Sequence, residues 1–559
     1  MSTFPWLTVI GAVPLVGALA IAVTPGHSAP GSEADRVTRR LLVKRLALVF
    51  SLITLGLTIA MMVAFKPGGA EFQFTQTYEW IPQFGVHYAV GVDGIALVLI
   101  AMTAVLMPVV VLASWNDADP AEQPEGAPPT ADAALARPRR GVKSYFALLL
   151  VLETMMIAVF AATDVFLFYV FFEAMLIPMY FLIGSFGVGQ RQYAAVKFLL
   201  YSLFGGLLML VAVIALYVYS ARGGHPGTFL FSHLVTVTFT PATQKWLFLG
   251  FFVAFAIKAP LWPFHTWLPD AATAAQPGTA VLLVGVMDKV GTFGMIRYCL
   301  QLFPAASRYF TPLILVLSVV GILYGAVVAI GQRDLKRLIA YTSVSHFGFI
   351  VLGIFVLTSQ GQSGATLYMV NHALATGALF LIAGFMIARR RSQRIADYGG
   401  VQKVAPLLAG LFLVSGLASL SLPGLSTFVS EFLVLVGTFT RYKVAASFAT
   451  AGIILAAIYI LWLYQRTMTG PVREEVADMP DLRPRELWAV GPLVALLIVF
   501  GVYPKPLLDL INPAVHDTLT QVHATDPAPQ HPSTASFRVG QQLILLRAGG
   551  AQIQKGITP

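Results

Sequence analysis

Eight ionisable residues interrupt long apolar stretches of this sequence. They are Glu153, Glu173, Lys258, Asp288, Lys289, His346, His372 and Glu431. A charge at the centre of a bilayer costs roughly 2.5–3.5 kcal/mol on insertion scales, so such residues are retained where they pair or face water. Desolvation and opposite charges shift the proton affinities of acids and bases in opposing directions. Contacts that form and break between these side chains would therefore suit the passage of protons.

The alternative is that the same residues form inert ion pairs that fix helix register. Five of the eight lie near the centre of their apolar stretch, and a shared depth favours a relay over unrelated pairs. These five are Glu153, Glu173, Lys258, Lys289 and His346. Asp288 adjoins Lys289, and adjacent residues on a helix point in different directions, so Asp288 is expected to serve another partner. His265 stands beside a proline break, where it is either a structural histidine or a further member of the relay.

The apolar stretches themselves indicate a membrane protein. Of 559 residues, 57% are hydrophobic and 11% are charged, against roughly 25% charged in soluble domains. A spanning helix needs roughly 20 apolar residues. Fourteen runs are predicted, at 5–24, 41–64, 91–113, 143–162, 164–186, 192–220, 246–266, 277–301, 309–330, 336–357, 363–388, 405–440, 446–467 and 486–504. This pattern excludes a soluble two-domain protein and a nucleic-acid binder, and it predicts an all-α polytopic membrane protein.

Positive charge is divided unevenly between the two sets of loops. The loops after the odd-numbered helices and the adjoining helix ends hold 23 Lys and Arg residues, and the opposite set holds seven. Loops rich in Lys and Arg remain in the cytoplasm. The division supports an even number of crossings and predicts that both termini lie outside the cytoplasm.

Two of the predicted helices are interrupted by proline. Pro260 and Pro263 break the seventh, and the Ser421–Gly424 segment breaks the twelfth. Such breaks are tolerated within a membrane only inside protein or beside water. Helices seven and twelve run in opposite directions, which indicates two inverted five-helix repeats at 143–301 and 309–467. Two independent proline kinks are the alternative.

Other segments fall outside these repeats. Residues 1–113 would hold helices 1–3, beginning with a retained helix rather than a cleaved signal, because residues 1–24 lack a basic start. Residues 114–142 are predicted to be a mobile cytoplasmic loop, 486–504 helix 14, and 513–559 a polar tail. Cys299 is the single cysteine, so no disulfide framework, cysteine metal site or iron–sulfur site is expected.

Three segments resemble a known family. They are FEAMLIPMY at 172–180, FAIKAPLWPFHTWLPD at 255–270 and DLKRLIAYTSVSH at 334–346. Over about residues 145–505 the sequence resembles the antiporter-like membrane subunits of respiratory complex I. The acid at Glu431 favours the subunit M branch, since subunits L and N and related sodium/proton antiporter subunits usually have lysine there.

The resemblance implies roles for individual residues. Glu173 and Lys258 would form the family's Glu–Lys pair, and Lys289 would be the connecting lysine. His346 and His372 would line a central polar axis, and Glu431 would be the last group toward the periplasm. No residue of this chain is expected to bind a cofactor or a metal.

The resemblance also implies an activity and its setting. The chain would be a proton-translocating subunit of an NADH:quinone oxidoreductase in the bacterial plasma membrane. NADH, FMN, iron–sulfur clusters and quinone would bind partner subunits, because this sequence has no Gly-rich nucleotide fingerprint and no cluster ligands. The expected partners are L-like and N-like antiporter subunits, small membrane subunits and membrane lipids, and no nucleic acid.

Two departures from the family and two other functions stay open. Ala272 and Ala274 stand where the family usually has a histidine and an acid, and Asp288 is unusual before Lys289. These changes bear on how protons are taken up from the cytoplasm. A cation/proton antiporter of the Mrp type or a membrane-bound hydrogenase subunit could share the bundle. A structural assembly subunit with inert buried charges is the other alternative.

Overall fold

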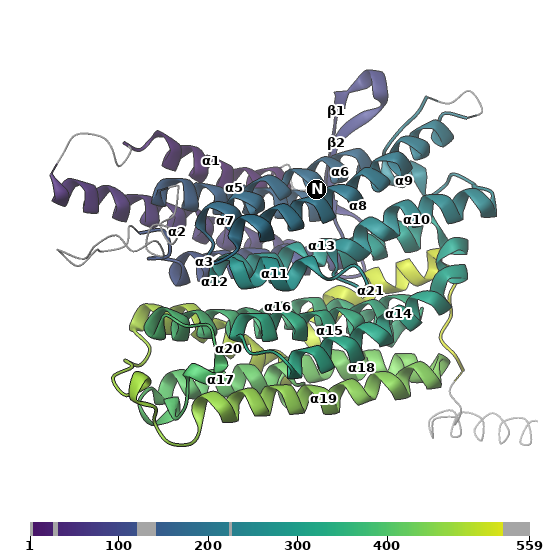
Figure 1. Cartoon of the computed structure of the whole chain (residues 1–559). Coiled ribbons are helices and arrows are strands. Elements are labelled where there is room, and N and C mark those ends of the chain that lie inside the picture. The colour runs from purple at the N-terminus through teal and green to yellow at the C-terminus, as the bar shows by residue number, and fades with distance from the viewer. Residues whose placement is uncertain (1–3, 26–31, 120–140, 223–225, 529–559) are drawn as a thin grey trace, which may run out of the picture. The chain divides into compact units, whose positions relative to one another are not determined.

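A computed structural model describes residues 4–25, 32–119, 141–222 and 226–528 (Figure 1). Most of them are helical. In the first half the helices are α1 (Trp6–Val23), α2 (Glu33–Ala64), α3 (Gly94–Ala113), α5 (Val142–Ala161), α6 (Val165–Ala174), α7 (Leu176–Phe186), α8 (Arg191–Ser220), α9 (Phe231–Leu234), α10 (Pro241–Lys258) and α11 (Trp267–Ala274). In the second half they are α12 (Pro277–Leu282), α13 (Lys289–Gly294), α14 (Pro304–Ile330), α15 (Leu335–Phe355), α16 (Ser359–Arg390), α17 (Pro406–Ser419), α18 (Ser426–Arg441), α19 (Lys443–Met468), α20 (Pro484–Val502) and α21 (Lys505–Gln521).

The predicted membrane class is confirmed. Twelve helices of the described chain, several of them continuous across adjoining elements, are long and apolar enough to cross a membrane. The seventh and twelfth predicted spans are instead the broken pairs α10–α11 and α17–α18. The count of fourteen crossings and the inverted repeats therefore stay predictions.

The first break, between α10 and α11, follows from its prolines. Pro260 has no N–H group, so the helical ladder stops at Lys258, the last residue of α10. The N–H of Leu261 bonds to the carbonyl of Ala256, which Pro260 cannot reach as a donor, and so the carbonyl of Ile257 needs another donor inside the bundle. The indole of Trp267, at the start of α11, donates a hydrogen bond of 2.9 Å to the carbonyl of Ile257. The break thus places Lys258 at a helix end without leaving the Ile257 carbonyl unsatisfied.

The second break, between α17 and α18, contains strained backbone. Ser421 has a φ of +62° and Gly424 a φ of +93°. A left-handed conformation is ordinary for glycine and costs about 1–3 kcal/mol for another residue. The hydroxyl of Thr427 bonds to the carbonyl of Ala418 across the break. The fold therefore keeps Ser421 in an unfavourable conformation that the sequence could have avoided with glycine.

The eighth predicted span is a mixed helix rather than a regular one. Between α12 and α13 the chain forms a π-helix, η2 (Leu283–Met287), and a second one, η3 (Met295–Leu300), follows α13. Asp288 and Lys289 stand where η2 passes into α13. Single π turns inside α-helices occur frequently at functional sites.

The helices lie side by side and define two ends of the bundle (Figure 1). At one end α2 begins, α3 ends, α12 begins and α16 ends, and we call it the arginine-rich end because Arg389, Arg390, Arg483 and Arg485 lie there. At the other end stands a hairpin that the sequence analysis did not foresee, made of strands β1 (Gln73–Ile81) and β2 (Val86–Val92).

Two predicted segments differ from the structure or fall outside it. Residues 513–521 were assigned to the polar tail, but they continue α21, which packs against α3 and α16. Leu507, Ile511, Val515 and Leu519 recur every four residues and form its buried stripe. Residues 120–140 of the predicted mobile loop and 529–559 of the tail lie outside the described residues. Residues 525–559 form a separate unit, of which the structure describes only 525–528.

Candidate functional site

Lys289 and His372 meet in the interior of the bundle. The Lys289 ammonium nitrogen, Nζ, lies 2.7 Å from Nδ1 of His372 on α16 and donates a 2.6 Å hydrogen bond to the carbonyl of Val284. Nζ also lies 4.9 Å from the ring centroid of Phe347, within the range of a cation–π contact. Both residues are fully buried. A proton on the lysine is thus in direct reach of the histidine.

His346 on α15 continues this contact. Its ring centroid lies 5.2 Å from that of His372, and its Nε2 lies 3.3 Å from the hydroxyl of Tyr459 on α19. The other nitrogen of each histidine, Nδ1 of His346 and Nε2 of His372, has no hydrogen-bond partner among the described residues. Buried nitrogen atoms without a protein partner usually form a hydrogen bond with internal water. When Nδ1 of His372 accepts from the lysine, its Nε2 carries the ring proton and can pass it on.

Glu431 lies at the far end of the same line. It is buried on α18 and accepts a hydrogen bond from the hydroxyl of Ser421, the strained residue of the second break. Its carboxylate interacts electrostatically with the hydroxyl groups of Tyr459 and Tyr368. Lys289, His372, His346, Tyr459 and Glu431 thus form a series that runs from α13 through α16, α15 and α19 to α18.

Glu173 and Lys258 approach each other without a direct ion pair. They interact electrostatically, but Nζ of Lys258 and Oε1 of Glu173 have no hydrogen-bond partner in the described part of the chain. The ammonium lies 4.7 Å from the ring centroid of Phe172. The Glu173 carboxylate occupies the space beside Gly206 of α8, where a side-chain Cβ would collide with it. A small residue at 206 is therefore what lets Glu173 reach its position.

Asp288 stands between the two lysines. It interacts electrostatically with Lys289 and Lys258, it is fully buried, and neither of its oxygens has a hydrogen-bond partner within the described ranges. Gly291 brings the helices together, because a Cβ there would lie 2.6 Å from the Phe255 carbonyl and 2.7 Å from the Ala259 nitrogen. Asp288 thus interacts with Lys289 as well as with Lys258, and a separate partner for this acid stays a prediction.

Glu153 and His265 lie apart from this series. Glu153 is fully buried on α5, and both of its carboxylate oxygens lack a hydrogen-bond partner among the described residues. His265 lies beside the first break, with its ring centroid 5.0 Å from that of Tyr324. Neither ring nitrogen of His265 has a described partner, so the hydrogen-bonded structural histidine that we considered is not what the structure has.

Sequence reasoning missed Tyr459 and Ser421. Tyr459 lies near the middle of the predicted 446–467 span, whereas tyrosines of membrane helices concentrate at the two interfaces. The position of Tyr459 within its span could therefore have identified it as a candidate from the sequence. Ser421 could have been singled out by its place in the proline break, but nothing in the sequence indicates that its hydroxyl faces Glu431.

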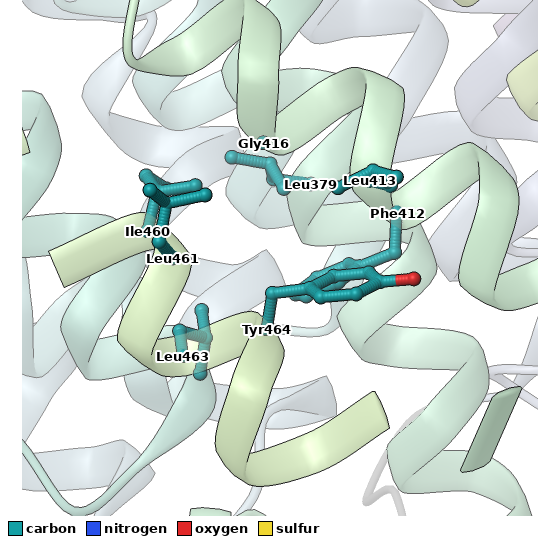
Figure 2. A pocket seen from close by; sticks show the side chains of 8 residues that line it. All are labelled: Leu379, Phe412, Leu413, Gly416, Ile460, Leu461, Leu463 and Tyr464. Atoms are coloured by element: carbon teal, nitrogen blue, oxygen red, sulfur yellow. The ribbon is translucent and has the colours of Figure 1, made fainter. Parts of the chain in front are cut away.

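A separate pocket of the bundle is lined mainly by apolar side chains. It lies between α16, α17 and α19, and Figure 2 shows Leu379, Phe412, Ile460 and Tyr464 among the side chains around it. The rings of Phe412 and Tyr464 are stacked, with centroids 6.3 Å apart. No carboxylate, lysine, arginine or histidine lines this pocket, and the hydroxyl of Tyr464 is the one side-chain polar group among its lining residues. Among the described residues, no cluster of three or more His, Cys, Asp or Glu side chains could hold a metal ion.

Comparisons with known proteins cover nearly the whole chain. Residues 162–458 match the transmembrane model of the NADH:quinone oxidoreductase/Mrp antiporter family. NADH-quinone oxidoreductase subunit M of Mycobacterium tuberculosis is 56% identical over 553 residues, which cover 96% of this chain and 98% of the relative. The subunit M of Rhodobacter capsulatus is 38% identical over 526 residues, or 93% of this chain and 97% of that protein.

Solved structures agree with the sequence comparison. A chain of respiratory complex I from Thermus thermophilus with bound NADH superposes with a TM-score of 0.80 and 28% identity, covering 92% of this chain and 99% of its own length. A chain of the Mrp complex from Dietzia sp. DQ12-45-1b gives 0.77 at 20% identity, covering 93% and 100%, which shows a shared fold alone. This chain belongs to the NADH:quinone oxidoreductase/Mrp antiporter family, among the antiporter-like subunit M proteins of complex I.

Proposed function

We propose that this proton-translocating membrane subunit moves protons along the series Lys289, His372, His346, Tyr459 and Glu431. The observation that carries the proposal is the 2.7 Å approach of Lys289 Nζ to His372 Nδ1, followed by the 3.3 Å approach of His346 Nε2 to the Tyr459 hydroxyl. Each member is an acid, a base or a hydroxyl group that can take a proton on one side and release it on the other. The remaining gaps are wide enough to need internal water or side-chain motion.

The Glu173–Lys258 pair would control the loading of Lys289. An acid that approaches Lys258 stabilises the charged form of that lysine, and withdrawal of the acid favours release of the proton. Asp288 lies between the lysines and senses both, so a change at Lys258 is felt at Lys289. Glu173 and Lys258 form no direct ion pair here, which corresponds to the state in which the acid is withdrawn and Lys258 releases its proton.

The direction of transport follows from charge. The arginine-rich end would face the cytoplasm by the positive-inside rule, so that both termini lie outside and Glu431 releases protons outward. The subunit M relatives from Mycobacterium tuberculosis and Rhodobacter capsulatus are bacterial, and the chain is a multi-pass protein of the bacterial plasma membrane.

The energy must come from other subunits. Moving one charge against 100 mV costs roughly 2.3 kcal/mol, and the described residues contain no cluster of potential metal ligands. NADH, FMN, iron–sulfur clusters and quinone would bind partner subunits, and their redox reaction would drive the change at Glu173. Other membrane subunits would cover part of the apolar helix surface, and lipids the rest.

The test is NADH-driven acidification of inverted membrane vesicles from cells that carry Lys258→Ala. NADH oxidation is measured in the same vesicles, assembly is checked by copurification, and Lys505→Ala is the control because Lys505 is exposed. Loss of acidification in an assembled complex supports the relay. Unchanged NADH-driven pumping would contradict it, and sodium-dependent proton exchange without NADH would then favour an antiporter. Loss of assembly with Lys258→Ala but not with Lys258→Arg would favour a structural role.

A further inference from the structure

A polar cavity of about 210 Å³ lies at the arginine-rich end. Residues from the ends of α3 and α16, the start of α12 and the approach to α20 line it. Asn116 on its wall is exposed, while Asp117 is half-buried. The cavity therefore gives water from that side access to a partly buried carboxylate.

Two acids line this cavity, and Asp117 is the one that can exchange a proton with water. The other acid, Glu486, is held by Arg389 in a two-point ion pair with distances of 2.5 and 3.2 Å. Asp117 lies beside Ser114, whose carbonyl accepts a 3.1 Å hydrogen bond from the Asp117 N–H, and it interacts electrostatically with Arg485, Lys336 and Asp119. Burial raises its pKa to about 6, against the opposing effects of Ser114, Arg485 and Lys336. A carboxyl group in that range can both bind and release a proton near neutral pH.

Polar side chains lead inward from Asp117. The Ser114 hydroxyl lies near Asp117 and Tyr145 of α5 but has no hydrogen-bond partner among the described residues, and a Cβ at Gly278 would collide with it. The hydroxyl of Tyr145 lies 3.4 Å from that of Thr279. Both residues are buried. These side chains lie between the cavity and α12, the first part of the mixed helix that carries Lys289.

The next proton-binding groups toward the interior are two buried carboxylates, Glu153 and Asp288. Glu153 lies eight residues beyond Tyr145 on α5, about 12 Å deeper in the bundle. Its two oxygens and those of Asp288 have no hydrogen-bond partner among the described residues, and α5 packs against α13. A buried charge without a partner is strongly unfavourable, so these groups are satisfied by protons or by internal water.

We propose that Asp117 takes up protons at the arginine-rich end and passes them through Ser114, Tyr145 and Thr279 toward Glu153, Asp288 and Lys289. The inference rests on the proposed function, which needs a source of protons for Lys289. Only protons move: Asp117 accepts one from water in the cavity and returns to the carboxylate when the proton passes on. Each hydroxyl accepts one proton and releases another.

The rival route starts in a second cavity, of about 330 Å³, beside α11. Its acid is Asp270, which pairs with Lys197 at 2.7 Å and with Arg337 at 2.8 Å. Ala274 lines it and Ala272 is buried nearby, at the positions where the resemblance leads one to expect an acid and a histidine. An acid held by two bases and followed by alanines is a poor acceptor, which favours the Asp117 route.

The experiment compares Asp117→Asn, Asp117→Glu and the control Glu475→Gln in inverted vesicles, where the arginine-rich end faces the medium. Glu475 is an acid near Arg390 at the same end, its side chain is 55% exposed, and it does not line the cavity. The readout is protons moved per NADH oxidised, with assembly checked by copurification. We expect Asp117→Asn to lower this ratio at least threefold, Asp117→Glu to restore at least half of it, and Glu475→Gln to leave it unchanged. Added imidazole, a diffusible proton carrier, should partly rescue Asp117→Asn, which a structural defect would not allow.

Other outcomes separate the two proposals. A wild-type ratio for Asp117→Asn, with a lowered ratio for Asp270→Asn, would overturn the uptake proposal. Lys289→Met is measured alongside: if it abolishes pumping while Asp117→Asn does not, uptake through Asp117 is wrong and the relay stands. If Lys289→Met pumps normally, the relay itself fails. Should Asp117→Asn not assemble, Tyr145→Phe carries the test, and a wild-type ratio in an assembled Tyr145→Phe complex overturns the route.

Discussion

Nζ of Lys289 lies 2.7 Å from Nδ1 of His372, although the residues are 83 positions apart and belong to different helices, α13 and α16. The contact joins the region of Glu173 and Lys258 to that of His346 and Glu431. Removing either partner would leave the other buried without its main polar contact. The proton pathway that we propose depends on this junction more than on any other contact.

Gly206 should be sensitive to a single added methyl group. In Gly206→Ala the new Cβ would collide with the Glu173 carboxylate, so the acid must move away from its present position. We expect the ratio of protons to NADH to fall at least twofold while the complex still assembles. Gly56→Ala is the matched control, since no atom lies within 4 Å of a Cβ at that helical glycine. Equal ratios in the two variants would contradict the assigned position of Glu173.

Tyr459 should matter for its hydroxyl and not for its ring. Tyr459→Phe keeps the packing of α19 and removes the group 3.3 Å from His346 Nε2. Because water can replace a lost hydroxyl in part, we expect proton pumping to fall by about three- to tenfold, which is less than the roughly 100-fold or larger effect of removing a catalytic proton-transfer group. Tyr464→Phe, on the same helix beside the apolar pocket of Figure 2, should pump as wild type. Normal pumping by Tyr459→Phe would exclude this step.

The ion pair between Arg297 and Asp93 should support the fold. Its two side chains are each 5% exposed and 2.6 Å apart, and Asp93 also caps α3 through the N–H of Ala96. Arg297→Met leaves a buried carboxylate unpaired, which typically costs about 3–5 kcal/mol. The amount of subunit in membranes, measured by immunoblot, should fall sharply.

The exposed pair of Lys505 and Asp509 provides the comparison for that prediction. Its side chains are 64% and 52% exposed, and exposed pairs contribute about 0–1 kcal/mol. Lys505→Met should leave the amount of subunit unchanged. A similar loss in both variants would mean that burial of the Arg297 pair is not what matters.

The pH dependence of pumping should reflect Asp117. Since burial raises the pKa of this carboxyl to about 6, its protonated fraction falls about tenfold for each pH unit above that value. Pumping limited by uptake should therefore decline as the pH on the arginine-rich side rises from 6 to 8. In Asp117→Asn the rate should be lower and nearly independent of pH over this range. A decline of the same steepness in the variant would assign it to another group.

The membrane class could be predicted because each span needs a long apolar run, and twenty consecutive residues are hard to misread. The hairpin β1–β2 was missed, since its strands alternate only weakly in burial and lie between two spans. The π turns around Asp288 and Lys289 leave no mark in composition. Residues 513–521 were assigned to the tail because they look polar overall, although their apolar side chains fall on one face of α21.

The ionisable residues of the candidate site could be predicted, because a charge inside the membrane is energetically costly. Lys289 and Glu431 stand out in apolar surroundings, whereas serine and tyrosine hydroxyls are common in membrane helices and carry no such cost. Which residues meet was beyond the sequence, because contacts such as that of Lys289 with His372 depend on how helices far apart in the chain pack. Asp117 was passed over because it lies in a segment whose composition resembles a loop.

The most direct test of the relay is the number of protons moved per NADH oxidised by purified complex in proteoliposomes, comparing wild type with Lys289→Met. Methionine keeps the length of the side chain and removes the charge that meets His372. We expect the assembled variant to lose most of its proton pumping. A variant complex that oxidises NADH and pumps with the wild-type ratio would show that protons do not pass through Lys289.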